Sequence, residues 1–252
     1  ELVHRHVAWL TALRYQLRAD KPWEQHLKAG KSNREFRENH YLVCEDTIPI
    51  KEAISDYISK EEYEEVFAKG NRASQFLGVQ SRRLKELKQQ GLIEDFRHME
   101  LSNMLVEFYT LQGKSERIKN FPYPRQFATL NYIFVWVFIL LLPFGIMEGF
   151  EGIGDHILED LEKHESHSSF THQLQHFIAQ HFVWFSIPFS ALLAWVFHTM
   201  EVIGEISENP FEGLGNDIPM LALSRVIEID LLEMLGEKDL PPSIEAQNGV
   251  LM

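Results

Sequence analysis

Two pairs of histidines lie close together in one stretch of this 252-residue chain. His172 and His176 are four residues apart, and His164 and His167 are three apart, so either pair falls on one face of a helix. Such a pair, with a neighbouring glutamate, can hold a divalent metal ion. The stretch lacks cysteine and an HExxH motif, so its residues do not indicate zinc catalysis.

These histidines also allow two other interpretations. Histidines beside acids titrate near neutral pH, which makes the stretch a candidate pH sensor. Pairs at helical spacing also arise by chance in a His-rich segment, and we favour a cap of two short amphipathic helices. The apolar side chains of this cap would pack over neighbouring apolar helices: Ile157, Leu158, Leu161, Leu174 and Phe177.

A second polar stretch, at residues 200–219, reads MEVIGEISENPFEGLGNDIP. It contains five acids: Glu201, Glu205, Glu208, Glu212 and Asp217. Proline and glycine end a helix and turn the chain, and asparagine or aspartate caps the segment after it. We therefore expect a stiff turn in which Asn209 and Asp217 act as caps and the acids form a solvated surface.

Two uncharged segments flank the histidines, at residues 127–147 and 182–200. At about 1.5 Å per residue, the first reaches roughly 31 Å as a helix, which matches the hydrocarbon core of a bilayer. Pro143 and Pro188 would break a soluble helix, but neighbouring membrane helices can satisfy the freed carbonyls. The alternative is two buried helices of a soluble protein, where uncharged runs of this length are rare. We expect a transmembrane hairpin over residues 126–200.

Charges around the two segments predict their orientation. Residues 148–181, between them, hold seven acids and one base, whereas three bases precede the first segment: Arg117, Lys119 and Arg125. By the positive-inside rule the N-terminal side is cytoplasmic and the His-rich loop at 148–181 is extracytoplasmic. This predicts a cytoplasmic helical domain at 1–125, the hairpin at 126–200, and a cytoplasmic loop, helix and tail at 201–252.

The remainder of the chain is predicted to be helical. Apolar periodicity predicts helices over about 2–19, over about 72–88 and up to about residue 118, and no strand pattern is found. Ser59 begins the sequence SKEE, a capping box that opens a short helix. The helix ending near residue 118 carries a stripe that we assign to the bundle core: Leu101, Met104, Leu105, Phe108, Leu111 and Ile118. The predicted fold class is all-α, a transmembrane hairpin plus a cytoplasmic helical bundle.

Composition excludes two classes of protein. A formal net charge of -13 argues against a general nucleic-acid binder. The single cysteine, Cys44, excludes an intrachain disulfide framework. Two membrane helices enclose no pore and the chain does not begin with Met, so we expect further helices from a missing N-terminal portion, from other subunits or from both.

Three segments of the chain, in order, resemble the bestrophin family. Residues 121–145, FPYPRQFATLNYIFVWVFILLLPFG, resemble its proline pair, uncharged helix and LLPFG ending. Residues 1–18, ELVHRHVAWLTALRYQLR, are similar to the helical segment that follows its second membrane helix, and residues 204–219 are similar to its NPF loop. The resemblance implies an all-helical, homopentameric ion channel whose membrane pore continues into a cytoplasmic vestibule. The first two membrane helices, which carry the pore neck in this family, have no counterpart in these residues.

The resemblance also raises the question of calcium. In animal members the NPF loop and the acids after it form a calcium clasp, and here Asn209 matches that motif, with Glu212 and Asp217 as candidate carboxylates. Residues 214–216 are Leu-Gly-Asn where animal members have consecutive acids. Because Ca²⁺ takes six to eight oxygen ligands, we favour an architectural turn over a calcium site at residues 209–217.

Family members have a narrow aperture at the cytoplasmic end of the vestibule. Counting back without gaps from Pro124 places this ring at Phe96, with Ile93 and Met99 one turn to either side. An apolar ring restricts hydrated ions by dewetting, whereas neighbouring acids would favour cations. The alternative is that Phe96 belongs to the core of the bundle.

The resemblance implies a passive channel for small monovalent inorganic ions, acting as a homopentamer in a lipid bilayer, the inner membrane of a bacterium. No catalytic residues are expected. The net charge favours cations, whereas animal relatives pass anions, so the selectivity stays open. Two alternatives remain: a non-conducting membrane scaffold or sensor, and a membrane protein that binds metal through the His-rich loop.

Overall fold

The computed structural model describes residues 1–21, 31–121, 125–163, 170–207 and 209–252. The chain forms two compact units, which we call the helical body (Glu1–Pro122 and Asn209–Met252) and the hairpin (Tyr123–Glu208). Within the described residues the regular elements are helices, and the extended pairing is a single isolated bridge between Gln247 and Val250. The all-α prediction is confirmed.

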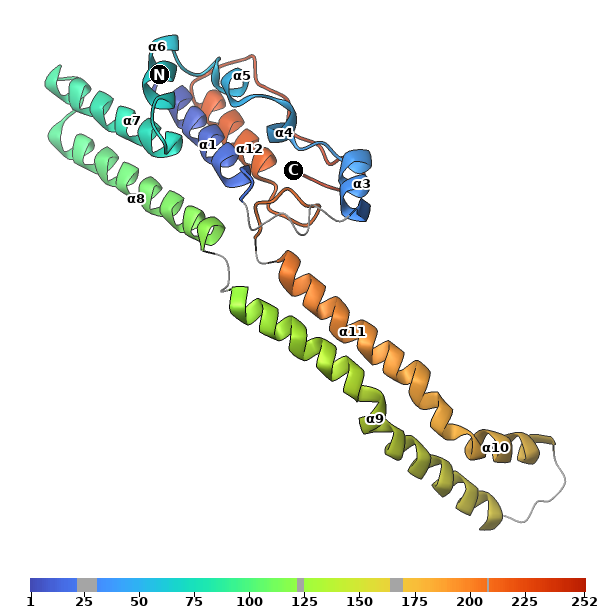
Figure 1. The fold of residues 1–252 in the computed structure, drawn as a ribbon. Coiled ribbons are helices and arrows are strands. Elements are labelled where there is room, and N and C mark those ends of the chain that lie inside the picture. The colour runs from blue at the N-terminus through green and yellow to red at the C-terminus, as the bar shows by residue number, and fades with distance from the viewer. Residues whose placement is uncertain (22–30, 122–124, 164–169, 208) are drawn as a thin grey trace. The chain divides into compact units, whose positions relative to one another are not determined.

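The helical body is built around helix α1 (Figure 1). Its helices are α1 (Leu2–Arg18), α3 (Lys31–His40), α4 (Cys44–Thr47), α5 (Ile50–Ile54), α6 (Lys60–Phe67), α7 (Arg72–Gln89), α8 (Asp95–Asn120) and α12 (Met220–Met234). Helix α1 packs against α5, α7, α8 and α12. The helices predicted over residues 2–19 and 72–88 and up to residue 118 are therefore present, with ends within two residues of those expected.

The core of the body joins α1 to α7 and α8. Phe76 and Ile54 are fully buried there, and Trp9 is 5% exposed. The Trp9 indole donates a hydrogen bond of 2.9 Å to the Oε1 atom of Gln112, and the Nε2 atom of Gln112 donates to Ser74 Oγ at 2.9 Å. Both the oxygen and the nitrogen of the buried Gln112 side-chain amide therefore have hydrogen-bond partners. These bonds fix the positions of α1, α7 and α8 relative to one another.

The predicted capping box at Ser59 is half confirmed. Ser59 is the N-cap of α6 and its side chain accepts a hydrogen bond from the Glu62 amide at 3.2 Å. The Glu62 carboxylate does not return to the cap. It pairs instead with Arg5 of α1, at 2.6 and 3.0 Å, because a buried guanidinium needs a charged partner more than an exposed amide does.

The stripe that we assigned to the bundle core on α8 is mostly exposed, so that assignment was wrong for a single chain. Leu105 is buried and Phe108 packs against the core. The other members are between 41% and 49% exposed: Leu101, Met104, Leu111 and Ile118. Helical spacing identifies an apolar face but not the surface that covers it. Among the described residues, α1 and α7 are the helices that pack most extensively against α8.

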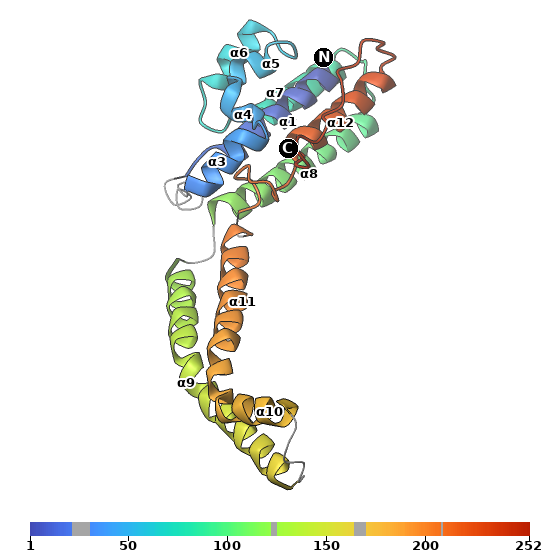
Figure 2. The same cartoon turned by 90° about the vertical axis from the view of Figure 1, so that its right-hand side faces the viewer.

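The hairpin contains α9 (Arg125–Lys163), α10 (Phe170–Gln180), the short 3₁₀ helix η1 (Phe182–Phe185) and α11 (Ser186–Ile206). Helix α9 runs unbroken through Pro143 and on through the acidic residues, so the predicted cap of two short helices is wrong in its first half. Pro188 lies in the first turn of α11, where its missing amide hydrogen has no partner to lose. Figure 2 shows α10 lying across the end of the hairpin.

Helices α9 and α11 pack side by side in opposite directions. Asn131 donates a hydrogen bond to Glu201 at 2.5 Å near one end of the pair. Aromatic rings meet along the rest: Trp136 with His198, Phe138 with Phe197, and Phe150 with Phe189. By length and composition, Thr129–Lys163 and Phe182–Gly204 could each cross a membrane, and in the most apolar stretch of each helix 0% and 11% of the residues are buried. Within the hairpin they are therefore not buried core helices.

Gly154 sets the distance between α9 and α10. A Cβ atom at Gly154 would lie 2.7 Å from the Ala179 carbonyl oxygen and 3.0 Å from Phe182 Cβ, whereas one at Gly152 would meet nothing within 4 Å. We expect Gly154→Ala to lower the free energy of unfolding of the hairpin by about 1 to 3 kcal/mol, through overpacking. Gly152→Ala should be neutral or stabilising by up to about 1 kcal/mol, through helix propensity. Equal unfolding temperatures for the two variants in detergent would contradict this account.

Candidate functional site

The loop after α11 is closed by its own polar side chains. The Asn209 Oδ1 atom accepts a hydrogen bond from the Phe211 amide at 3.2 Å. Asp217 Oδ2 accepts from the amides of Gly213 at 2.7 Å and Leu214 at 2.9 Å. Asn209 thus caps the residues that follow it, as expected. Asp217 instead accepts from amides that precede it in the loop. Helix α12 begins after Pro219 with no side-chain cap. The expectation that Asp217 caps the segment after it was wrong.

Gly213 lets the loop approach the rest of the body. Its φ angle is +83°, which favours glycine, and a Cβ atom there would lie 3.4 Å from both Arg18 Nη1 and Val43 Cγ2. The Tyr41 hydroxyl donates to the Gly213 carbonyl at 3.3 Å. The loop therefore packs its backbone directly onto buried side chains of α1 and of the segment before α4.

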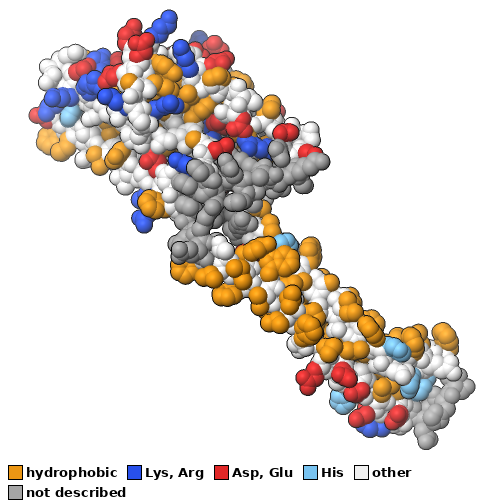
Figure 3. Space-filling model, in the orientation of Figure 1, with side chains coloured by type: hydrophobic (Ala, Val, Ile, Leu, Met, Phe, Trp, Pro, Cys, Tyr) orange, Lys and Arg blue, Asp and Glu red, His pale blue; other side chains and the backbone are white. Residues whose placement is uncertain are grey.

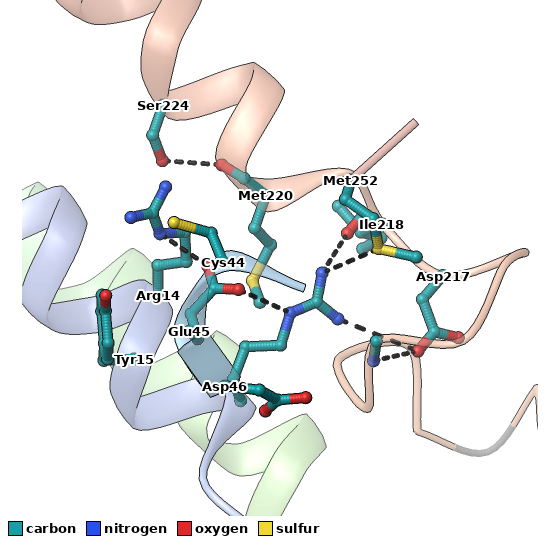
Figure 4. Close-up of polar contacts among 12 residues, drawn as sticks. Arg14, Tyr15, Cys44, Glu45, Asp46, Asp217, Ile218, Met220, Ser224 and Met252 are labelled. Carbon is teal, nitrogen blue, oxygen red and sulfur yellow. Dashed lines mark hydrogen bonds and ion pairs between the residues drawn. The ribbon is translucent and has the colours of Figure 1, made fainter. Parts of the chain in front are cut away.

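Arg18, at the end of α1, is the centre of this packing. Its guanidinium is buried, with Nε 3.9 Å from Glu45 Oε2 and Nη1 3.9 Å from Asp217 Oδ2. Its Nη2 atom donates to the Ile218 carbonyl at 3.3 Å and to the Met252 sulfur at 3.8 Å. Figure 4 shows the Glu45 and Asp217 carboxylates that lie near this group. One side chain therefore ties α1 to α4, to the loop and to the C-terminal tail.

Because these charged groups are buried, the pKa of each one depends on the charges of the others. Desolvation lowers the pKa of Arg18, and Glu45 and Asp217 partly offset this effect. Desolvation also raises the pKa of Asp217, against the two amide donors and the nearby Arg18. Glu45 has a second partner, since Arg14 Nε lies 2.7 Å from its Oε1. Buried charges of this kind are costly unless every one is paired.

The loop residues do not fit a calcium ion. The described residues supply two carboxylates here, Glu212 and Asp217, and Glu212 Oε1 accepts a hydrogen bond from the side-chain Nδ2 atom of Asn209 at 3.2 Å. Asp217 already serves two amides and a guanidinium. Calcium requires six to eight oxygen atoms, so this set is too small and too occupied. The positive charge beside Asp217 is that of Arg18.

Several of the residues that pack against this loop were not predicted from the sequence. These residues are Arg18, Tyr41, Glu45 and Met252, which lie far apart in the sequence. Arg18 ends the segment at 1–18 that resembles the family, but no local pattern linked it to the loop or to the other three. The C-terminal tail folds back onto the body: the Ala222 amide donates to the Met252 carbonyl at 2.9 Å, and Met252 is buried.

The candidate aperture residues are only partly brought together. Phe96 is 81% exposed and Met99 is 56% exposed on the first turns of α8, so Phe96 is not part of the core of this chain. Ile93 lies before α8 begins at Asp95 and packs against the core cluster of the body. Phe96 and Met99 therefore remain candidates for a ring, whereas Ile93 packs against the core of the body.

Two of the four candidate histidine ligands lie among the described residues. His172 and His176 lie on α10, and His172 Nε2 lies 3.4 Å from the Leu161 carbonyl of α9. His164 and His167 fall outside the described residues. Among the residues that the structure describes, no three metal-binding side chains come together. Ile157, Leu158 and Leu161 on α9 are half-buried. Leu174 and Phe177, which the cap was expected to bury, are exposed.

Comparison with known proteins identifies the fold. The family model described as "Bacterial/Fungal Bestrophin protein" matches residues 1–153 and 168–233. A crystal structure of a bacterial bestrophin homologue from Klebsiella pneumoniae superimposes with a TM-score of 0.64 at 19% identity, covering 94% of this chain and 66% of that one.

Two curated relatives bear the name "Voltage-dependent anion channel-forming protein YneE". The Salmonella typhi protein is 26% identical over 193 residues, which is 77% of this chain and 53% of the relative. The Escherichia coli (strain K12) protein is 25% identical over 196 residues, or 78% and 54% respectively. The chain thus spans about half the length of these relatives. Since the family model covers most of its residues, the chain belongs to the bacterial/fungal bestrophin family.

Proposed function

We propose that this chain is a pore-forming part of a bestrophin-type ion channel that conducts small monovalent ions passively. The observation that carries the proposal is the hairpin: two helices long enough to span a bilayer, with their apolar side chains facing outward. Exposed apolar surface of this extent requires lipid or other subunits to cover it. In this proposal the protein is a multi-pass membrane protein of the bacterial inner membrane and has no catalytic residues.

We further propose that five copies surround one pore. Two helices enclose no channel, and the exposed apolar face of α8 requires a covering surface. Contact between neighbouring copies would supply it. Phe96 and Met99, exposed on the first turns of α8, are the proposed ring at the cytoplasmic aperture.

The relatives' names support anions as the conducted ions. This weighs against the preference for cations that we drew from the net charge of -13. Net charge does not specify which surface carries it, and many of the acids lie on the far part of α9 and on the outside of the body (Figure 3). We therefore propose that the aperture and neck, and not the overall charge, set the selectivity.

An ion-flux assay tests the proposal. The full-length protein is reconstituted in liposomes with a salt gradient across the membrane, so that the equilibrium potentials of chloride and of its cation have opposite signs. The reversal potential of the current is then measured. We expect a conductance with a reversal potential close to the chloride value. A reversal potential at the cation value would restore the cation preference. The absence of conductance would favour the scaffold or sensor alternative.

A further inference from the structure

Helix α10 has one face that is packed against α9. Ala179 is 3% exposed, and its carbonyl oxygen lies where a Cβ atom of Gly154 would have to fit. His172, on the same side of α10, reaches the Leu161 carbonyl at 3.4 Å. The side chains of Ala179 and His172 therefore face the acidic part of α9.

The outward face of α10 is apolar. Its exposed side chains are Phe170 at 78%, Leu174 at 47%, Phe177 at 60% and Ile178 at 37%. Their spacing of i, i+4, i+7 and i+8 places them in one stripe along the helix. A helix at the surface of a soluble unit normally turns its apolar stripe inward, so the arrangement here is inverted.

This stripe is continuous along the chain with the apolar surface of the hairpin. After α10 the chain passes directly into η1 and α11, where Trp184 is 64%, Phe185 49% and Ile187 58% exposed. Figure 3 shows hydrophobic side chains covering the hairpin up to the region of α10, with acids gathered on the last part of α9. An exposed Trp at the end of a span is typical of the boundary between lipid and water.

The dimensions of α10 restrict what it can do in a membrane. Its 11 residues reach roughly 16 Å, about half of the hydrocarbon core, so it cannot be a further span. It carries no Lys, Arg, Asp or Glu, and both ribbon views show it running across the end of α11 and not extending that helix (Figures 1 and 2). A short uncharged helix with one apolar face suits the plane of the membrane interface.

We infer that α10 is an interfacial helix whose Phe170, Leu174, Phe177 and Ile178 side chains insert into the outer lipid surface. The inference rests on the proposed function, because it requires α9 and α11 to span the bilayer. Its ligand is the headgroup and acyl-chain boundary of neutral phospholipid, since α10 has no Lys or Arg to attract anionic lipid. Contact between Gly154 and Ala179 fixes the depth of α10 relative to the span.

Site-specific quenching tests this inference. Cys44→Ala removes the single cysteine of this chain, and one cysteine is then placed in the full-length, cysteine-free protein at Phe177 or at Gln175, a polar position of the same helix. Leu140 and Leu192, exposed on the two spans, serve as membrane references. Each variant carries an environment-sensitive fluorophore in phosphatidylcholine vesicles. Brominated acyl chains quench from the lipid side and iodide from the aqueous side.

We expect the label at Phe177 to be quenched by brominated lipid nearly as strongly as the labels at Leu140 and Leu192. The label at Gln175 should be quenched mainly by iodide. Equal iodide quenching at Phe177 and Gln175 would overturn the inference and place the stripe in water. Protection of Phe177 from both quenchers would also overturn it, by placing another subunit over the stripe. In either case lipid quenching at Leu140 and Leu192 would leave the proposed function intact. Loss of lipid quenching at both references would contradict the membrane span, and the inference with it.

Discussion

Replacing Arg18 with methionine is expected to lower the free energy of unfolding of the helical body by about 3 to 5 kcal/mol. The substitution keeps most of the side-chain volume but removes the charge that lies between Glu45 and Asp217. Asp217 then stays buried with only amide donors, and the loop and tail lose the hydrogen bonds that Arg18 gives to Ile218 and Met252. The measurement is chemical unfolding in detergent, with hydrogen exchange of residues 209–218 as a local readout.

Arg82→Met is the matched control for this experiment. Arg82 pairs with Glu65, but both side chains are about half exposed, so the loss should be at most about 1 kcal/mol. Calcium chelation should leave unfolding of the unmodified protein unchanged, since Arg18 supplies the positive charge beside the loop. Equal losses in the two variants, or a chelator effect as large as that of Arg18→Met, would contradict the role given to Arg18.

The loss in the Arg18→Met variant should also depend on pH. Burial already raises the pKa of Asp217, and removing the guanidinium removes a group that lowers it. A carboxyl with a raised folded-state pKa holds a proton that the unfolded chain has released. Stability is therefore retained at low pH and lost as pH rises through the raised pKa of Asp217. The variant should be closer to the unmodified protein at acidic than at neutral pH.

Phe96→Ala is expected to raise the single-channel conductance several-fold. In the proposed pentamer five phenylalanine rings narrow and dewet the cytoplasmic aperture, and truncating them admits hydrated ions. Because Phe96 is 81% exposed in the chain, the free energy of unfolding should change by less than about 0.5 kcal/mol. Conductance and stability are therefore separable at this position, and planar-bilayer recording combined with unfolding measures both.

Phe121→Ala provides the control, since it is the same substitution at a phenylalanine that is 78% exposed at the other end of α8. It should leave conductance unchanged. A second variant, Phe96→Asp, should shift the reversal potential toward that of the cation by adding a ring of negative charge. If Phe96→Ala and Phe121→Ala conduct alike, and Phe96→Asp leaves the reversal potential unchanged, Phe96 does not form the aperture.

The elements of this fold were largely predictable because they depend on local signals. Ser59 marks a helix start by capping, which acts within a few residues. The uncharged segments at 127–147 and 182–200 likewise reveal themselves by composition alone. The passage of α9 through Pro143 was expected for a membrane helix, but its continuation beyond residue 147 to Lys163 was not, because the acidic residues there were assigned to a separate cap.

The candidate site was less predictable because its contacts join distant residues. Arg18 and Met252 are separated by nearly the whole chain, and no motif links them. The α8 stripe shows the converse difficulty. Its period correctly identified an apolar face, but residues such as Met104 and Leu111 remain exposed in one chain. Periodicity specifies which side chains share a face, whereas the covering surface belongs to the assembly.

The mass of the detergent-purified, full-length protein, measured by native mass spectrometry, tests the central claim most directly. The account predicts five copies of the subunit, because a pore requires a ring and α8 requires a covering surface. A monomer or dimer at the same protein concentration would leave no axial pathway and would contradict the channel proposal.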